Sequence, residues 1–183
     1  MRLLSEYGDT EVHWVVLGSN GRRNKEAIAS ANRFLVNTKK KKIIIKNFKD
    51  GYFPYNGGEI KTFFEKLKKK VSPDIIFTHY RNDLHQDHRL ISDLTWNTFR
   101  DHLILEYEIP KYDGDLGQPN VFVPLNKVLC FKKIENILKC FKTQKSNHWF
   151  TQDTFLSTLR IRGLESNAPQ KYAEGFYCRK LVF

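Results

Sequence analysis

Apolar and polar positions alternate in a regular order through the first half of the chain. Short runs of β-branched and aromatic residues are separated by longer segments in which apolar side chains recur every three or four positions. Continuous apolar strands joined by amphipathic helices are typical of an α/β fold, in which a parallel sheet is covered by helices on both faces. The pattern predicts strands at 12–17, 43–45 and 74–79, and helices at 22–35, 59–71 and 87–99.

The second half has the same kinds of element in a less regular order. Residues 1–8 resemble the end of a helix, and no capping residue or first turn precedes them. With 183 residues and neither an internal repeat nor a low-complexity linker, the chain is predicted to be one domain spanning 1–183. Beyond residue 100 the pattern predicts strands at 103–109, 121–125 and 176–182, and helices at 126–141 and 151–162.

The chain is strongly basic, with 31 Lys and Arg against 20 Asp and Glu and a net charge of +11. Most of the excess is lysine, gathered at 39–42 and at 66–70, where predicted helices end. Cations are favoured near helix C-termini, so these clusters are explained without a ligand. Because no platform of stacking aromatic residues is interleaved with them, we expect no nucleic-acid partner.

Two further features bear on location. No apolar stretch approaches the roughly 20 residues that span a bilayer, and the first residues resemble neither a secretory signal nor a transit peptide. Cys130, Cys140 and Cys178 show no Cys-x-x-Cys spacing, which favours reduced thiols. We therefore expect a cytoplasmic protein without a membrane span.

The densest chemistry lies at residues 83–88, where two histidines and two aspartates fall within six positions. This segment directly follows the predicted strand 74–79, and ligands of open parallel sheets bind beyond the carboxyl ends of strands. Imidazole and carboxylate groups bind zinc, and a carboxylate can also orient a histidine. A polar loop that opens a helix is the structural alternative. The placement after a buried strand favours a functional site.

Pro73 to His79, followed by Asp83-x-His85-x-Asp87-His88-Arg89, resembles the second signature of the PIG-L/LmbE-like zinc-dependent deacetylases. These enzymes remove acetyl groups from N-acetylglucosamine-type sugars and related amides. Residues 17–31 and 172–176 are also similar to segments of this family, so the resemblance spans nearly the whole chain. It implies a Rossmann-like α/β fold with a mostly parallel sheet and helices on both faces. Gln86 stands where the signature usually has proline.

The resemblance also implies a role for each residue of the loop. His88 would bind zinc, His85 would polarise or protonate the reacting group, and Asp87 would hold His85 in orientation. We further expect Arg81 and Asp83 to contact the substrate, with a solvated loop as the alternative for Arg81. The implied function is a zinc-dependent hydrolase that removes N-acetyl groups from an N-acetylglucosamine-type sugar or glycoconjugate.

One part of the family pattern is absent. The first signature, Ala-His-Pro-Asp-Asp, supplies two zinc ligands and the general base in the family, and this sequence does not contain it. We therefore expect the first strand to be missing, two neighbouring strands to have unpaired edges, and the chain as it stands to bind zinc poorly and to be inactive or impaired. The alternative function is a non-catalytic homologue that binds sugars or anions.

Three explanations of the missing signature remain open. The chain is a fragment or has a wrongly chosen start, it is a degenerate homologue, or a different metal set operates. That different set would consist of His79, Asp83, His85 and His88.

Overall fold

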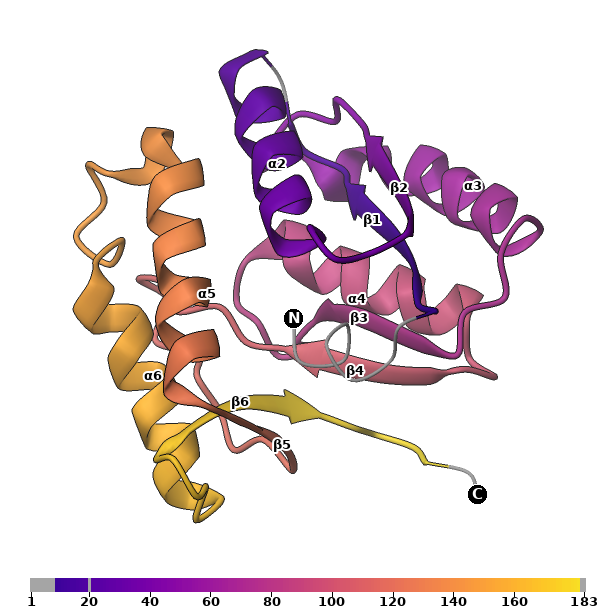
Figure 1. Ribbon diagram of the computed structural model, residues 1–183. Coiled ribbons are helices and arrows are strands. Elements are labelled where there is room, and N and C mark those ends of the chain that lie inside the picture. Colours follow the sequence, from indigo (N-terminus) through magenta and orange to yellow (C-terminus); the bar gives the residue numbers. More distant parts are fainter. Residues whose placement is uncertain (1–8, 20, 182–183) are drawn as a thin grey trace. The chain divides into compact units, whose positions relative to one another are not determined.

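A computed structural model describes residues 9–19 and 21–181 (Figure 1). The predicted helix end at 1–8 therefore lies outside the described residues, as do Asn20 and the end of the last predicted strand. The chain divides into two compact units, each made of two separated stretches. The first unit comprises Met1–Lys49 and Pro124–Glu174, and the second comprises Asp50–Val123 and Gly175–Phe183. That residues 1–183 form a single domain stays a prediction.

The first unit contains a two-stranded parallel sheet. Strands β1 (Glu11–Val16) and β2 (Lys40–Ile45) are joined by helix α2 (Gly21–Phe34). Helix α5 (Lys127–Cys140) packs against α2, and helix α6 (Gln152–Glu165) packs against α5 (Figure 1). The buried residues of α2 are Glu26, Ala27, Ser30 and Ala31, so three of the four are small.

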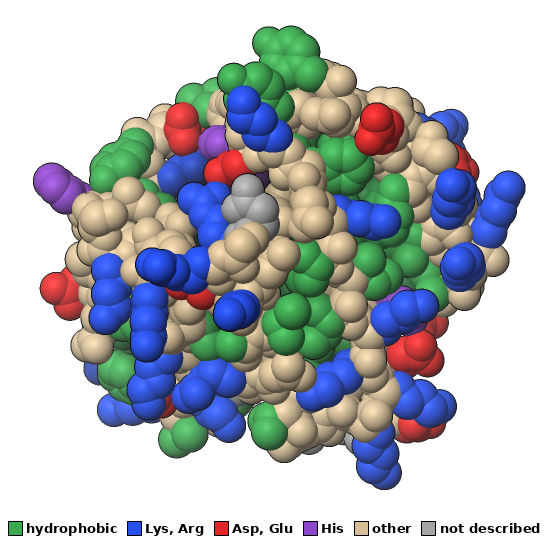
Figure 2. Space-filling model, turned by 90° about the horizontal axis from the view of Figure 1, so that it is seen from above, with side chains coloured by type: hydrophobic (Ala, Val, Ile, Leu, Met, Phe, Trp, Pro, Cys, Tyr) green, Lys and Arg blue, Asp and Glu red, His purple; other side chains and the backbone are tan. Residues whose placement is uncertain are grey.

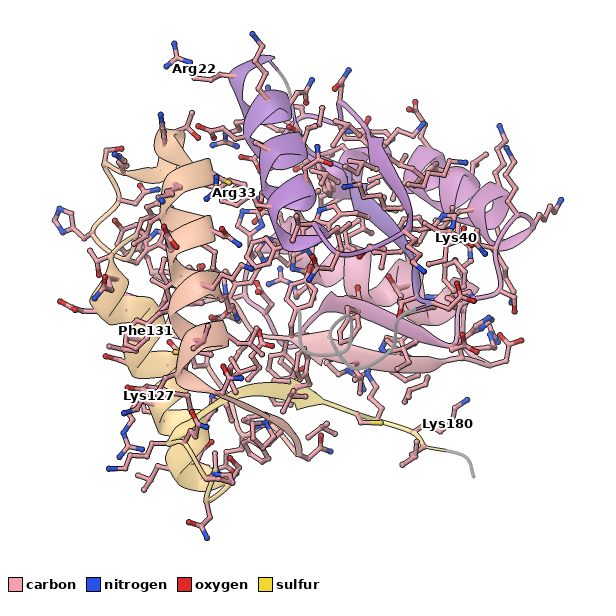
Figure 3. The ribbon with its side chains drawn as sticks, viewed as in Figure 1. Arg22, Arg33, Lys40, Lys127, Phe131 and Lys180 are labelled. Atoms are coloured by element: carbon pink, nitrogen blue, oxygen red, sulfur yellow. The ribbon has the colours of Figure 1, made fainter. Side chains whose placement is uncertain are left out.

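Two polar contacts also join elements of the first unit. Glu26 accepts hydrogen bonds from the backbone N–H and the hydroxyl of Thr143, at 2.9 and 2.6 Å. Thr143 lies in the 3-10 helix η2 (Lys142–Gln144). Arg33 reaches from α2 towards α5 and donates to Asn136 at 3.0 Å (Figure 3). Glu26, which lies in a segment that carries the family resemblance, therefore has a structural role.

Helix α6 continues past the point where the sequence predicted its end. The predicted helix ended at residue 162, just before Gly163, but the helix runs on to Glu165. A Cβ atom at Gly163 would lie 2.1 Å from the carbonyl oxygen of Lys171. The glycine is thus required by the close approach of another backbone segment, and it does not terminate the helix.

The second unit contains the remaining helices and most of the second sheet. In chain order its elements are η1 (Phe53–Asn56), α3 (Gly57–Lys68), β3 (Ile75–His79), α4 (Gln86–Thr98) and β4 (Leu103–Tyr107). Strands β5 (Val121–Leu125) and β6 (Tyr172–Tyr177) have residues in both units. The strand order is β3-β4-β6-β5, with β3 parallel to β4 and β6 antiparallel to β4. The predicted α/β class with a mostly parallel sheet is confirmed.

The described strands form two sheets, and the sequence had suggested one. In the described part of the chain, β1 pairs only with β2 and β3 pairs only with β4. On β3, Ile75 and Phe77 are 37% and 45% exposed although the strand sequence is continuously apolar. Two strands with an unpaired edge were expected. The expected cause, a missing strand, stays a prediction.

The last strand was predicted in the wrong place. It begins at Tyr172 and ends at Tyr177, whereas the apolar run had suggested 176–182. Gly175 lies within this strand and is buried, and a glycine inside a strand normally weakens a sequence-based strand prediction.

The surface features are ordinary. Lys and Arg side chains are spread over the face in Figure 2, with hydrophobic side chains between them. No helix among the described residues is long and apolar enough to cross a membrane. Cys130, Cys140 and Cys178 form no disulfide.

Candidate active site

The loop between β3 and α4 carries the predicted catalytic residues. His85 is the N-cap of α4, with an extended backbone (φ −73°, ψ 121°), and its Nδ1 accepts the backbone N–H of Asp87 at 3.3 Å. Gln86 is therefore the first helical residue. Proline is favoured at that position and requires an extended residue before it. The local geometry explains why the family signature has proline there and why glutamine also fits.

His88 is oriented by a buried carboxylate. Its Nδ1 lies 2.9 Å from Oδ2 of Asp83, and the side chain of Asp83 is 3% exposed. The other oxygen of Asp83 accepts the backbone N–H of His85 at 2.8 Å. With Nδ1 engaged, Nε2 of His88 remains for a ligand. A carboxylate that holds one nitrogen of a histidine is the usual support of a metal-binding imidazole.

A second histidine ring packs against His88. The rings of His79 and His88 are parallel, with centroids 4.0 Å apart and planes 5° from each other. Burial, reinforced by the nearby His88, lowers the pKa of His79 to about 3. His79 is therefore neutral at physiological pH, and its ring fixes the plane of His88.

Lys111 joins the site from the segment after β4, and no sequence pattern marked it. Its Nζ lies 3.1 Å from Asp83 and also pairs with Asp115, while Asp115 accepts the backbone N–H of Leu84 at 2.7 Å. Burial raises the pKa of Asp83, but the hydrogen bond and charge of His88, with His85 and Lys111, outweigh it and lower that pKa to about 2. These contacts orient His88, and the predicted direct contact of Asp83 with substrate stays a prediction.

Asp87 makes contacts that the sequence did not suggest. It is 2% exposed and accepts the backbone N–H groups of Gly51 at 2.6 Å and Phe53 at 3.0 Å. Among the hydrogen bonds of the described residues, none joins its carboxylate to the ring of His85. The side chain of Gln86 also donates to the carbonyl oxygen of Gly51, at 3.1 Å. The first turn of α4 therefore holds the backbone of 51–53.

In the described part of the chain, one group of three side chains brings metal-binding atoms together. Atoms of Asp50, His85 and Asp87 lie within 4.8 Å of one another. The oxygen and nitrogen donors suit a divalent cation. Both oxygens of Asp87 already accept amide hydrogens, however, and the positive end of the α4 dipole disfavours a cation there. The free Nε2 of His88 therefore fits a metal better. The alternative set of His79, Asp83, His85 and His88 is not gathered into such a group.

Arg81 is exposed, and its backbone has a fixed partner among the described residues. Its N–H donates to Glu106 at 2.9 Å. Glu106 is fully buried and also accepts from Trp96 and Arg179, both at 2.6 Å. This network fixes the start of the site loop. Contact of the Arg81 guanidinium with substrate stays a prediction. Asp50 is a residue that the sequence analysis missed, because its only signal was the Asp-Gly pair typical of a turn.

Comparison with known proteins identifies the family. Residues 5–99, more than half of the chain, match the model of the PIG-L family, described as GlcNAc-PI de-N-acetylase. The chain therefore belongs to the PIG-L family. A comparison with curated proteins finds no match.

Several solved structures share the fold. The N,N′-diacetylchitobiose deacetylase from Pyrococcus horikoshii has a TM-score of 0.63 at 23% identity, over 97% of this chain and 75% of that one. GalB, the 4-carboxy-2-hydroxymuconate hydratase from Pseudomonas putida, has a TM-score of 0.71 at 16% identity, over 94% and 85%. The zinc-inhibited form of teicoplanin deacetylase Orf2 has a TM-score of 0.65 at 13% identity, over 86% and 73%. Since one of these is a hydratase, the fold alone does not fix the reaction.

Proposed function

We propose that this chain has the architecture of a zinc-dependent hydrolase that removes N-acetyl groups from an N-acetylglucosamine-type sugar or glycoconjugate. Membership of the PIG-L family and two deacetylases among the similar structures support the reaction class. The observation that carries the proposal is His88, whose Nδ1 is held by Asp83 so that Nε2 is left for a metal. The cytoplasmic location predicted from the sequence is part of the same proposal.

In this proposal His88 binds zinc. When bound, zinc polarises the acetyl carbonyl and lowers the pKa of a water ligand to about 7. Asp83 and Lys111 keep the imidazole of His88 in one orientation, and the stacked ring of His79 fixes its plane. The side chains that support His88 are thus Asp83, Lys111 and His79.

His85 is proposed to polarise or protonate the reacting group. Its Nδ1 accepts a backbone N–H, so the proton of the neutral ring is on Nε2. In this form Nε2 donates a hydrogen bond that polarises the reacting group. Protonation of the leaving amine requires the imidazolium, which carries a second proton on Nδ1 in place of the backbone hydrogen bond. Asp87 acts on His85 through the backbone of the helix N-terminus and through its charge. Arg81 is proposed to contact the sugar.

We also propose that the chain by itself holds zinc weakly. Catalytic zinc sites use three protein ligands, and the signature that supplies the other ligands in the family is not in the sequence. One imidazole with well-placed support is a weak site.

Zinc titration of the 183-residue chain tests the metal assignment. The wild type should bind zinc weakly, His88→Ala should abolish that binding, and His85→Ala should retain it. In a version preceded by the first signature, His85→Ala should keep the metal and lose the release of amine from N,N′-diacetylchitobiose. One tightly held zinc in the wild-type chain, or unchanged zinc binding in His88→Ala, would contradict the assignment.

A second candidate, which the sequence also left open, is a non-catalytic homologue that binds sugars or anions. It predicts measurable affinity for N,N′-diacetylchitobiose and no amine release in either version of the chain. Amine release by the version with the first signature excludes it.

A further inference from the structure

The backbone that precedes α3 is attached to the first turn of α4. Asp87 accepts the N–H groups of Gly51 and Phe53, and Gln86 donates to the carbonyl of Gly51. Three hydrogen bonds thus fix a short stretch more than 30 residues away in sequence. The side chain of Phe53 is 6% exposed and anchors the stretch in the core. The orientation of His85 does not require these bonds to residues 51–53, so we expect the attachment to have a further role.

One of the three bonds depends on a side chain that differs from the usual family signature. Proline, the residue that the family signature usually has in place of Gln86, has no side-chain donor and cannot bond to Gly51. The helix start would accept either residue, because position 86 is the first helical residue and His85 is extended. Glutamine therefore adds a contact to the stretch without being needed for the helix.

The attached stretch presents two aromatic side chains to solvent. Tyr52 is 46% exposed and Tyr55 is 83% exposed, and their ring centroids are 5.9 Å apart with planes tilted by 48°. Tyr52 lies between the two residues whose amides bind Asp87, so its backbone is fixed. Exposed aromatic rings on a fixed backbone provide apolar contact area at small entropic cost.

We propose that Tyr52 and Tyr55 form a carbohydrate-stacking surface beside His85, held in place by Gln86 and Asp87. This inference rests on the proposed function. The C–H face of a pyranose ring is apolar and packs on an aromatic ring, whereas its hydroxyls need polar partners. The carboxylate of Asp50, within 4.8 Å of a nitrogen of His85, is such a partner.

The arrangement assigns a substrate class of at least two sugar rings. The acetylated ring lies at His85, and the next sugar ring lies on the tyrosines. A monosaccharide occupies the first position alone and gains nothing from the tyrosines. The difference between one ring and two is therefore the quantity to measure.

Sugar binding to the whole chain, followed by NMR titration, tests the surface without requiring hydrolysis. N,N′-diacetylchitobiose and N-acetylglucosamine are the two probes. Tyr55→Ala should weaken binding of the disaccharide about fivefold to tenfold and leave the monosaccharide unchanged. Tyr55→Phe should retain the wild-type affinity because it keeps the ring. Phe131→Ala, which removes an exposed ring from α5, is the matched control and should change neither affinity (Figure 3).

Gln86→Pro tests the attachment. The variant keeps the helix start and loses one bond to Gly51. It should weaken binding of the disaccharide about twofold to threefold, consistent with the loss of one neutral hydrogen bond. Amide hydrogen exchange gives a second readout, since exchange at Gly51 and Phe53 should accelerate in this variant while exchange in the middle of α4 stays the same.

Two results would overturn the inference. One is equal affinity of the wild type and Tyr55→Ala for the disaccharide, and the other is a wild type that binds neither sugar. Amine release and zinc binding are measured separately, so the two proposals fail separately. Disaccharide binding that depends on Tyr55, without hydrolysis, would support the stacking surface and contradict the enzyme assignment. Hydrolysis that Tyr55→Ala does not change would support the enzyme assignment and contradict the stacking surface.

Discussion

The two units are stabilised in different ways. In the first unit α2 buries the small residues Ala27 and Ala31, and Gly163 lies against the backbone of Lys171. Glu26 is the buried acid among the described residues of this unit. In the second unit three carboxylates are almost fully buried around one loop, each with at least two hydrogen-bond donors. These carboxylates are Asp83 at 2%, Asp87 at 2% and Glu106 at 0% exposure.

The difference shows where buried charge is used in this protein. A buried carboxylate is unfavourable unless its oxygens accept hydrogen bonds or pair with cations. Such groups are therefore placed where they fix a backbone or a ring. Glu106 fixes the start of the site loop, Asp83 its middle, and Asp87 the stretch attached to α4. The predictions below test this contrast between apolar packing and charged positioning.

The largest effect is expected for Lys111→Met. The change leaves Asp83 and Asp115, whose side chains are 3% and 5% exposed, without the cation between them. Breaking a buried pair in this way costs about 3–5 kcal/mol. Denaturant unfolding should show this loss of stability. The control is Lys132→Met, an exposed lysine of α5, which should change the stability by less than about 0.5 kcal/mol. Equal stability of the two variants would contradict the positioning role of the charge.

Gly163→Ala should have the next largest effect. The new methyl group would meet the backbone of Lys171, so the helix or the segment after it must shift, which costs about 1–3 kcal/mol. Gly58→Ala in α3 is the matched control. Nothing lies within 4 Å of its Cβ position, so alanine should stabilise the protein by up to about 1 kcal/mol. If both variants changed the stability in the same direction, the close-approach explanation would be wrong.

A smaller loss is expected for Thr143→Val, which preserves shape and removes the hydroxyl that donates to Glu26 at 2.6 Å. Glu26 keeps the backbone N–H of residue 143, so the loss should be about 1–2 kcal/mol. Thermal unfolding measures it. The same substitution at Thr62, an exposed residue of α3, should have a smaller effect.

The smallest effect concerns pH. Burial raises the pKa of Glu174, but the charge and hydrogen bond of Lys133 outweigh it and lower that pKa. A carboxyl group with a lowered folded-state pKa adds stability above its unfolded pKa, and this stability is lost as the pH falls through the folded value. Lys133→Met should therefore be less stable than wild type at pH 7, by under about 1 kcal/mol because the pair is partly exposed. The difference should disappear in acid. A difference that persists at low pH would point to lost packing.

Much of the fold and part of the site follow from the sequence, because periodicity and capping are local. The helix predicted at 87–99 is found at 86–98, and the strand predicted at 121–125 is found there. The loop at 83–88 was identified as the chemical centre, and the structure brings His85 and His88 together with ring centroids 4.5 Å apart.

The partners of the buried acids were decided only by the tertiary structure. Asp83 meets Lys111, and Asp87 meets the amides of Gly51 and Phe53. These contacts join residues that are far apart along the chain, and no local pattern of polar and apolar residues encodes which distant backbone returns to a carboxylate. The sequence therefore indicated which residues are proposed to carry the chemistry. The positions of the segment after β4 and of residues 51–53, before α3, decided which partners Asp83 and Asp87 contact.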